Sequence, residues 1–80
     1  MESLVKLALE LKRVADLNND TFDLTIEIDV VGRAIYYEIV CEEDTDSHSF
    51  LSVRDVDLDQ AAIRAFAMIP DACKEWGYKV

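Results

Sequence analysis

Alternating carboxylates form the first arrangement in the chain that could perform chemistry. The stretch DVDLD, residues 55–59, places an aspartate at every second position, as in calcium-binding loops whose carboxylates converge on one ion. The rest of that pattern is missing, because Gln60 replaces the glycine of the sharp turn and Phe66 stands where a bidentate glutamate is required. We therefore interpret residues 55–59 as the solvated start of a helix, and we expect no metal site and no cofactor.

Two further arrangements could support acid–base catalysis. His48 is the only histidine, but catalysis or transition-metal binding through it needs further ligands nearby, and Cys41 is expected to face inward. Glu27 and Glu38 are predicted to form a carboxylate pair, yet an open strand face has no pocket that would desolvate either group. The sequence therefore indicates that the protein is not an enzyme and has no catalytic residue.

The paired carboxylates also raise a question of stability. The stretch TIEIDVVGRAIYYEIV, residues 25–40, predicts two antiparallel strands. In the expected register Glu27 lies opposite Glu38, and Asp23 lies opposite Glu42. Like charges directly opposite each other destabilise a strand pair by about 0.2 to 1 kcal/mol. Folding stability does not explain this choice, so the acids form either a binding surface or only a solvated face.

The charge of the chain is concentrated in its middle. The 80 residues carry a net charge of −9, and residues 20–60 contain twelve acids against two bases, Arg33 and Arg54. Such a surface repels nucleic acid and anionic membranes, so we expect neither to bind directly and a partner protein to carry a basic surface. A chain of this length, 51% apolar, supports one hydrophobic core, so residues 1–80 are predicted to form a single domain.

The two cysteines, Cys41 and Cys73, fall in different predicted elements. The sequence shows no secretory signal and no apolar run long enough to cross a membrane. We therefore expect both thiols to be reduced and buried as small apolar side chains, in a cytoplasmic protein.

Two segments show the periodicity of amphipathic helices. Residues 3–17 repeat apolar side chains at intervals of three and four, with charged residues on the opposite side. A second helix is expected to begin after Asp57, which with Gln60 three residues later resembles a capping box. Pro70 interrupts the apolar stripe of this helix, which predicts either a kink or a break followed by a short piece over residues 70–76.

A hairpin is predicted between the helices. Residues 22–30 alternate strictly between apolar and polar side chains, and the tight loop Gly32-Arg33 sends the chain back along residues 34–42. With Gly32 at the first position of a type II′ loop, one register turns the apolar sets of both strands to the same face. A slip by one residue would turn the apolar set of the second strand to water, so the register is well specified.

A third predicted strand, residues 48–53, completes the sheet. Leu51 and Val53 are expected to face inward and Phe50 outward, with the opposite facing of Phe50 left open. The elements then follow the order helix, strand, strand, strand, helix. The predicted fold is therefore α+β (α-β-β-β-α), a three-stranded antiparallel sheet with both helices packed on one face and the other face exposed.

This order of elements resembles the double-stranded-RNA-binding domain, whose helices also pack on one face of a sheet. That family carries a lysine-rich signature at the start of its second helix. Here the corresponding residues, 57–60, are Asp-Leu-Asp-Gln. The resemblance implies the fold, whereas the acidic residues argue against binding RNA by the family's route.

A short, strongly acidic chain of one domain also resembles the small phage-encoded inhibitors of the anti-CRISPR type. Several of those proteins present carboxylates to the nucleic-acid sites of CRISPR nucleases or surveillance complexes. The resemblance implies a viral protein that inhibits a CRISPR effector in the cytoplasm of a host cell. These inhibitors share no motif, so no residue role is carried over from them.

We predict a protein-binding module that acts as a nucleic-acid mimic and blocks a basic nucleic-acid-binding surface of its partner. The predicted partner-binding residues are Asp23, Glu27, Asp29, Tyr36, Glu38, Glu42, Glu43, Asp44 and Asp46. The alternative is a small acidic structural or assembly protein that forms a homo-oligomer, such as a homodimer. Its contacts would be apolar residues near Val5, Leu9, Phe50 or the carboxyl end.

Overall fold

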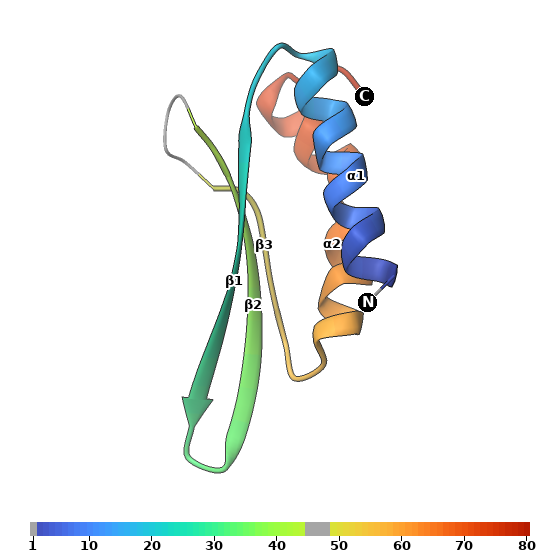
Figure 1. Cartoon of the computed structure of the whole chain (residues 1–80). Helices are drawn as coiled ribbons and strands as arrows, with labels where there is room; N and C mark the ends of the chain where they lie inside the picture. The colour runs from blue at the N-terminus through green and yellow to red at the C-terminus, as the bar shows by residue number, and fades with distance from the viewer. Residues whose placement is uncertain (1, 45–48) are drawn as a thin grey trace.

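The computed structural model of the chain, which describes residues 2–44 and 49–80, contains five elements. In chain order they are α1 (Glu2–Leu17), β1 (Phe22–Val31), β2 (Ala34–Glu43), β3 (Ser49–Asp55) and α2 (Leu58–Trp76). The strands form one antiparallel sheet in the order β1-β2-β3, and both helices lie on the same side of it (Figure 1). The predicted α-β-β-β-α fold is therefore confirmed.

Helix α1 forms because its apolar residues recur on one side. Leu7, Leu11 and Val14 are buried, as the spacing of an amphipathic helix requires. Exposed ion pairs between residues four apart support the solvent side, each worth about 0.3 to 0.5 kcal/mol. The helix ends at Leu17, and Asn19 adopts a φ of 53° in the turn that follows, a conformation that asparagine tolerates.

The hairpin has the predicted register. Val31 pairs with Ala34 across the two-residue loop, and Glu27 pairs with Glu38. Gly32 adopts a φ of 60°, whereas Arg33 keeps a negative φ, as a type II′ loop requires.

Strand β3 contains an irregularity that the sequence did not reveal. Cys41 pairs with Leu51, whereas the next residue, Glu42, pairs with Ser49, so Phe50 is an extra residue in the ladder. Such a bulge interrupts the alternation of a strand, and Phe50 and Leu51 are both buried as a result. The prediction that Phe50 faces outward is wrong for this reason.

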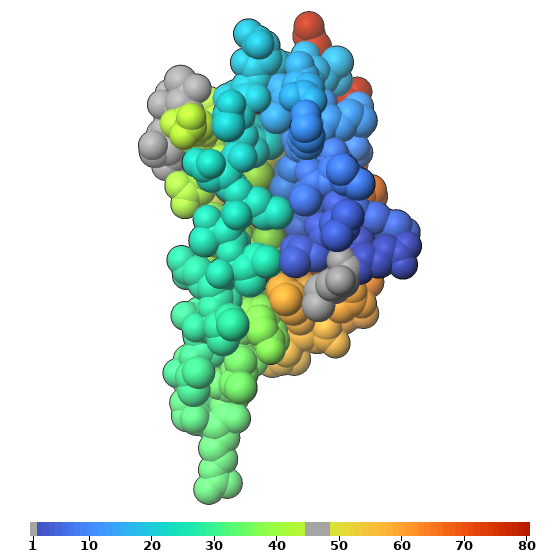
Figure 2. Space-filling model, in the orientation of Figure 1, coloured from blue at the N-terminus to red at the C-terminus, as the bar shows by residue number. Residues whose placement is uncertain are grey.

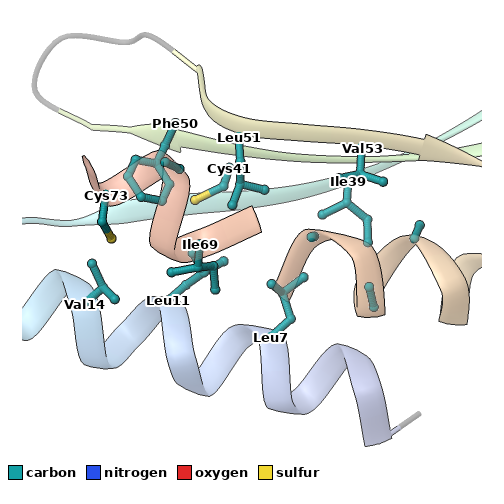
Figure 3. Packing of buried hydrophobic residues seen from close by; sticks show 14 residues of the cluster. Leu7, Leu11, Val14, Ile39, Cys41, Phe50, Leu51, Val53, Ile69 and Cys73 are labelled. Atoms are coloured by element: carbon teal, nitrogen blue, oxygen red, sulfur yellow. The ribbon is translucent and has the colours of Figure 1, made fainter. Parts of the chain in front are cut away.

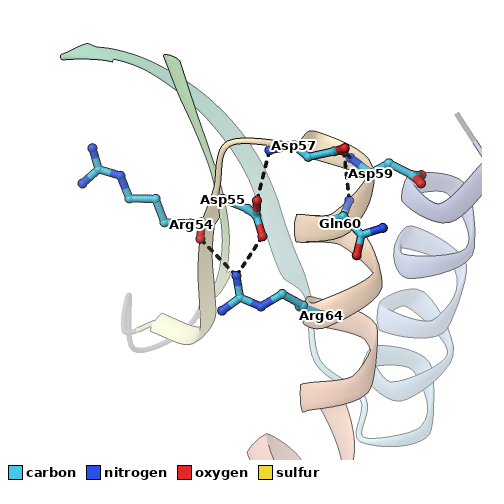
Figure 4. Close-up of polar contacts among 6 residues, drawn as sticks. All are labelled: Arg54, Asp55, Asp57, Asp59, Gln60 and Arg64. Carbon is cyan, nitrogen blue, oxygen red and sulfur yellow. Dashed lines mark hydrogen bonds and ion pairs between the residues drawn. The ribbon is translucent and has the colours of Figure 1, made fainter. Parts of the chain in front are cut away.

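Helix α2 begins with a cap built from two aspartates (Figure 4). The Asp57 carboxylate accepts hydrogen bonds from the backbone N–H groups of Asp59 (2.9 Å) and Gln60 (3.2 Å), as the capping prediction required. The reciprocal bond to the Asp57 N–H comes from the Asp55 carboxylate at 3.1 Å, not from Gln60. Asp55 also accepts a bond from Arg64 at 3.0 Å. These donors, the Asp57 N–H first, lower the pKa of Asp55.

Helix α2 runs through Pro70 without interruption and ends before Gly77, so the predicted break is wrong. A proline at this position removes one backbone hydrogen bond, but Pro70 is exposed, and buried Ile69 and Cys73 anchor the helix on either side. Gly77 closes the helix with a φ of 75°, and its N–H bonds to the Cys73 carbonyl, as glycine C-caps do.

The core lies between the sheet and the helices (Figure 3). Leu7, Leu11 and Val14 of α1 meet Ile69 of α2 there, and these side chains pack on residues of β2 and β3 that include Ile39, Cys41, Leu51 and Val53. Helix α2 lies over β3 and β2, whereas α1 packs chiefly on α2 and has few contacts with β1. Neither described helix combines the length and apolarity needed to span a bilayer.

The helices leave one end of the hairpin uncovered. The chain measures 41 × 25 × 17 Å because residues 28–37, here named the hairpin arm, extend beyond both helices (Figures 1 and 2). Ile28, Val30 and Ile35 of the arm are exposed although their strand positions face the same side as the core. The helices therefore cover only part of the apolar face of the sheet.

Candidate protein-binding face

The outer side of the sheet carries the predicted acids. Strand alternation turns them away from the core, and the register places Asp23 opposite Glu42 and Glu27 opposite Glu38. Together with Asp29 these residues form a surface that we name the acidic face. Both helices lie on the other side of the sheet (Figure 1), so no element formed by residues 2–44 and 49–80 covers it.

Strand geometry sets the charge spacing on the acidic face. Outward positions along one strand are about 6.8 Å apart, and neighbouring strands are about 4.8 Å apart. The phosphates of each nucleic-acid strand follow one another at about 3.4 Å of helix axis. Two strands of carboxylates thus approach the charge density of a nucleic-acid backbone, although the row formed by Thr25, Val40 and Ser52 is uncharged.

Arg54 is a member of this surface that sequence reasoning missed. Arg54 lies on β3, where it pairs with Glu38 of β2. Its guanidinium lies 3.9 Å from the Asp29 carboxylate and 4.6 Å above the centroid of the Tyr36 ring. The signal was present, because alternation over residues 51–54 turns Arg54 outward once Leu51 faces in. The row formed by Glu27 and Glu38 therefore ends with a positive charge, Arg54, on the third strand.

The ion pair between Arg54 and Asp29 does not neutralise the acidic face. Both side chains are more than 40% exposed, and pairs of this kind contribute about 0 to 1 kcal/mol. Glu27 lies on β1, where its cross-strand neighbour is Glu38 rather than Arg54. The repulsion between the two glutamates is therefore eased by Arg54 but not removed.

Glu43 does not belong to the acidic face, contrary to the prediction. It pairs with Phe22, whose position faces the core, so its side chain turns inward and is only 7% exposed. The nearby Tyr78 hydroxyl donates to the Asp20 carboxylate at 2.7 Å. Burial, together with hydrogen bonds to Asp20 and Glu43, raises the pKa of Tyr78. This polar cluster closes the end of the core.

The remaining predicted acids lie where β2 ends. Asp44 is exposed, and its backbone N–H bonds to the Thr21 carbonyl at 3.0 Å. Asp46 and His48 lie outside the described residues. The structure thus brings together the following predicted site residues on one face: Asp23, Glu27, Asp29, Tyr36, Glu38 and Glu42.

The two thiols are free and buried, as predicted. Burial, with smaller contributions from Asp23 and Glu42, raises the pKa of Cys41 to about 12. Burial raises the pKa of Cys73 as well. A protonated, buried thiol is a poor nucleophile, so neither cysteine has the properties of a reactive site.

Two open depressions occur on the helix side of the described chain. One, of about 330 Å³, lies between α1 and the start of β1, and its lining includes Leu11, Ala15 and Leu24. The other, of about 320 Å³, is lined by residues that include Phe66. Neither contains an acidic pair of the sheet, and within residues 2–44 and 49–80 no three metal-ligating side chains gather closely enough to hold an ion.

No protein-family model matches the sequence, and neither a curated protein nor a solved structure gives a significant match. Functional inference therefore rests on the residues and their arrangement.

Proposed function

We propose that the protein is a binding module whose acidic face docks on a basic nucleic-acid-binding surface of a partner protein and blocks it. The observation that carries this proposal is the placement of like-charged pairs on an uncovered sheet face. Each opposed pair destabilises the fold by about 0.2 to 1 kcal/mol. A cationic partner would supply the counter-charges that Arg54 provides only in part.

Electrostatic complementarity explains how such a module finds its target. Opposite surface potentials accelerate encounter and suppress other partners. Tyr36 adds a partly exposed aromatic side chain, and tyrosine is enriched among the residues that dominate binding energy. The Arg54 guanidinium already lies over this ring.

A CRISPR effector is one partner class with the required chemistry, because lysine and arginine line its nucleic-acid channels. A viral inhibitor of that kind, acting in the cytoplasm of a host cell, agrees with the resemblance of this short acidic chain to anti-CRISPR proteins. The site of the proposed module consists of the acidic face and Tyr36, with Asp44 beside it.

Capture from a lysate tests the proposal. The immobilised protein is expected to retain proteins with basic nucleic-acid-binding surfaces, and to release them as the salt concentration rises. The Glu27→Lys/Glu38→Lys variant is expected to retain none of them, because both side chains belong to the acidic face. Retained proteins would then be assayed for nucleic-acid binding with and without the module.

A matched control separates the acidic face from net charge. Asp71→Lys/Glu75→Lys changes the net charge by the same amount at exposed positions of α2, away from the sheet. This variant should retain the same proteins as the unmodified chain. Equal retention by all three proteins would show that the acidic face is only solvated.

Homo-oligomer formation, the alternative predicted from the sequence, is favoured by a separate observation. The inner surface of the hairpin arm is apolar and uncovered. This surface lies on the opposite side of the sheet from the acidic face, so self-association and partner binding are compatible.

A further inference from the structure

The hairpin arm and Ile26, which precedes it on β1, expose a contiguous apolar surface. Ile26, Ile28, Val30 and Ile35 are 38%, 64%, 71% and 49% exposed. All four occupy the inner side of the sheet, where they continue the row of Leu24 beyond the helices. Single apolar residues at a surface are ordinary, whereas a contiguous patch marks a site of association.

A second exposed apolar surface lies on the flank of α1 that faces β1. Val5 and Leu9 lie one helical turn apart on α1, and Ala8, three residues after Val5, lines the depression between α1 and β1. Val5 is 56% exposed and Leu9 62%. Because α1 has few contacts with β1, Val5 and Leu9 stay exposed beside the strand.

The two edges of the sheet differ. On β3 the Arg64 side chain donates to the Arg54 carbonyl at 3.2 Å, so α2 protects that edge. In the part of the chain that the structure describes, no side chain or loop bonds the outer edge of β1. This strand of ten residues also contains no proline and no lysine, the residues that commonly prevent pairing at an edge.

We propose that the chain forms a two-fold symmetric homodimer in which β1 pairs antiparallel with β1 of a second copy. An axis through Ile26, perpendicular to the sheet, places Ile28 opposite the partner's Leu24 and Val30 opposite the partner's Phe22. The helices cover only the Phe22 end of each sheet. The axis therefore brings each hairpin arm beneath the exposed flank of α1 in the partner.

The apolar surface available approaches the amount that a stable dimer buries. The exposed fractions of Val5, Leu9, Ile26 and the three arm residues together equal about three and a half complete aliphatic side chains, or roughly 300 to 400 Å². A specific interface buries roughly 800 Å² on each partner, of which somewhat more than half is apolar. The backbone groups along the β1 edge supply the polar part.

Charge complementarity supports the same register. Arg33 makes no ion pair within residues 2–44 and 49–80, and it lies at the tip of the arm. The symmetry axis brings this tip beside the partner's Asp20. On the outer face Asp29 would lie opposite the partner's Asp23, and Arg54, 3.9 Å from Asp29, reduces that repulsion. The acidic faces of both copies then form one continuous surface on a six-stranded sheet.

Sedimentation equilibrium tests the dimer directly. The protein concentration would be varied about a hundredfold, tenfold on each side of the Kd of the dimer. The average mass should be that of a dimer at high concentration and should fall toward that of a monomer on dilution. Ile28→Glu/Val30→Glu should remain monomeric at least tenfold beyond that Kd. Both positions are largely exposed, so the circular dichroism spectrum should be unchanged. A monomer at every concentration would overturn the proposal.

Cysteine cross-linking tests the symmetry axis. Opposed residues of antiparallel strands have Cα atoms about 4.5 to 5.5 Å apart, within the range of a disulfide. Ile26→Cys should therefore form a covalent dimer under mild oxidation, because the native thiols are buried. Val56→Cys, at a more exposed position in the loop before α2 (62% against 38% for Ile26), should not. A dimer in which Ile26→Cys fails to cross-link would overturn the β1 pairing.

Discussion

The guanidinium of Arg54 lies 4.6 Å above the centroid of the Tyr36 ring. This contact joins the edge strand β3 to the middle strand β2 on the outer side of the sheet. Because Arg54 is also 3.9 Å from the Asp29 carboxylate, one cation spans all three strands of the acidic face. The outer side of the sheet therefore carries one positive side chain among its carboxylates.

Replacing Arg54 should destabilise the fold slightly. An exposed cation–π contact contributes about 0.5 to 1 kcal/mol, so Arg54→Gln is expected to lower the free energy of unfolding by about that amount, measured by urea denaturation. Lys79→Gln is the matched control, because Lys79 is exposed and its side chain has no ion pair in the described parts of the chain. Equal effects of the two variants would contradict the role of Arg54.

Removing one charge of the opposed pair should have the reverse effect. Glu27→Gln keeps the shape of the side chain, abolishes repulsion with Glu38, and is expected to stabilise the fold by about 0.2 to 1 kcal/mol at low salt. The gain should shrink as salt screens the charges. Glu75→Gln, on the exposed side of α2, should show no comparable gain; a salt-independent gain in Glu27→Gln would point to strand propensity instead.

Tyr78 makes stability depend on alkaline pH. Its pKa in the folded state is raised by burial and by hydrogen bonds to Asp20 and Glu43, whereas the unfolded chain titrates near its ordinary value of about 10. The contribution of Tyr78 is therefore fully present below about pH 10 and is lost as the pH rises further toward the folded-state pKa.

Tyr78→Phe removes that contribution. The variant should lose about 1.5 kcal/mol at neutral pH, the lower end for a hydrogen bond to a charged group, and the deficit should shrink above about pH 10. Urea denaturation at neutral pH and above about pH 10 measures the difference in the free energy of unfolding between the variant and the unmodified chain. Tyr36→Phe, on the outer face of the sheet, is the matched control, because it removes a tyrosine hydroxyl outside the Asp20–Tyr78 contact. A deficit in Tyr78→Phe that stays constant with pH would refute the linkage.

Phe50 tests the bulge in β3. Its ring stacks on Phe22 with centroids 4.7 Å apart and meets Tyr78 edge-on at 5.3 Å. Phe50→Ala should therefore cost about 3 to 5 kcal/mol, measured by thermal or urea denaturation. Ser52→Ala, two residues further on the outer side, should change stability by less than about 0.5 kcal/mol. A comparably small loss for Phe50→Ala would place its side chain in solvent.

Local patterns in the sequence determined the order of the elements, the register of the hairpin and the outward position of the acids. Period-two alternation fixes which residues share a face, and Gly32 fixes where the strand reverses. The same alternation could have placed Arg54 on the outer side of the sheet, since Leu51 and Val53 were already predicted to face inward.

Only the tertiary structure decided what covers each face. Phe50 became a core residue because a bulge shifted the pairing of β3, and Glu43 became buried because the sheet continues one residue beyond the expected strand. Helix α2 passed through Pro70 because packing on both sides holds it. The helices lie over one end of the sheet and leave the hairpin arm bare. Periodicity assigns a residue to a face, but burial depends on which distant segment reaches that face.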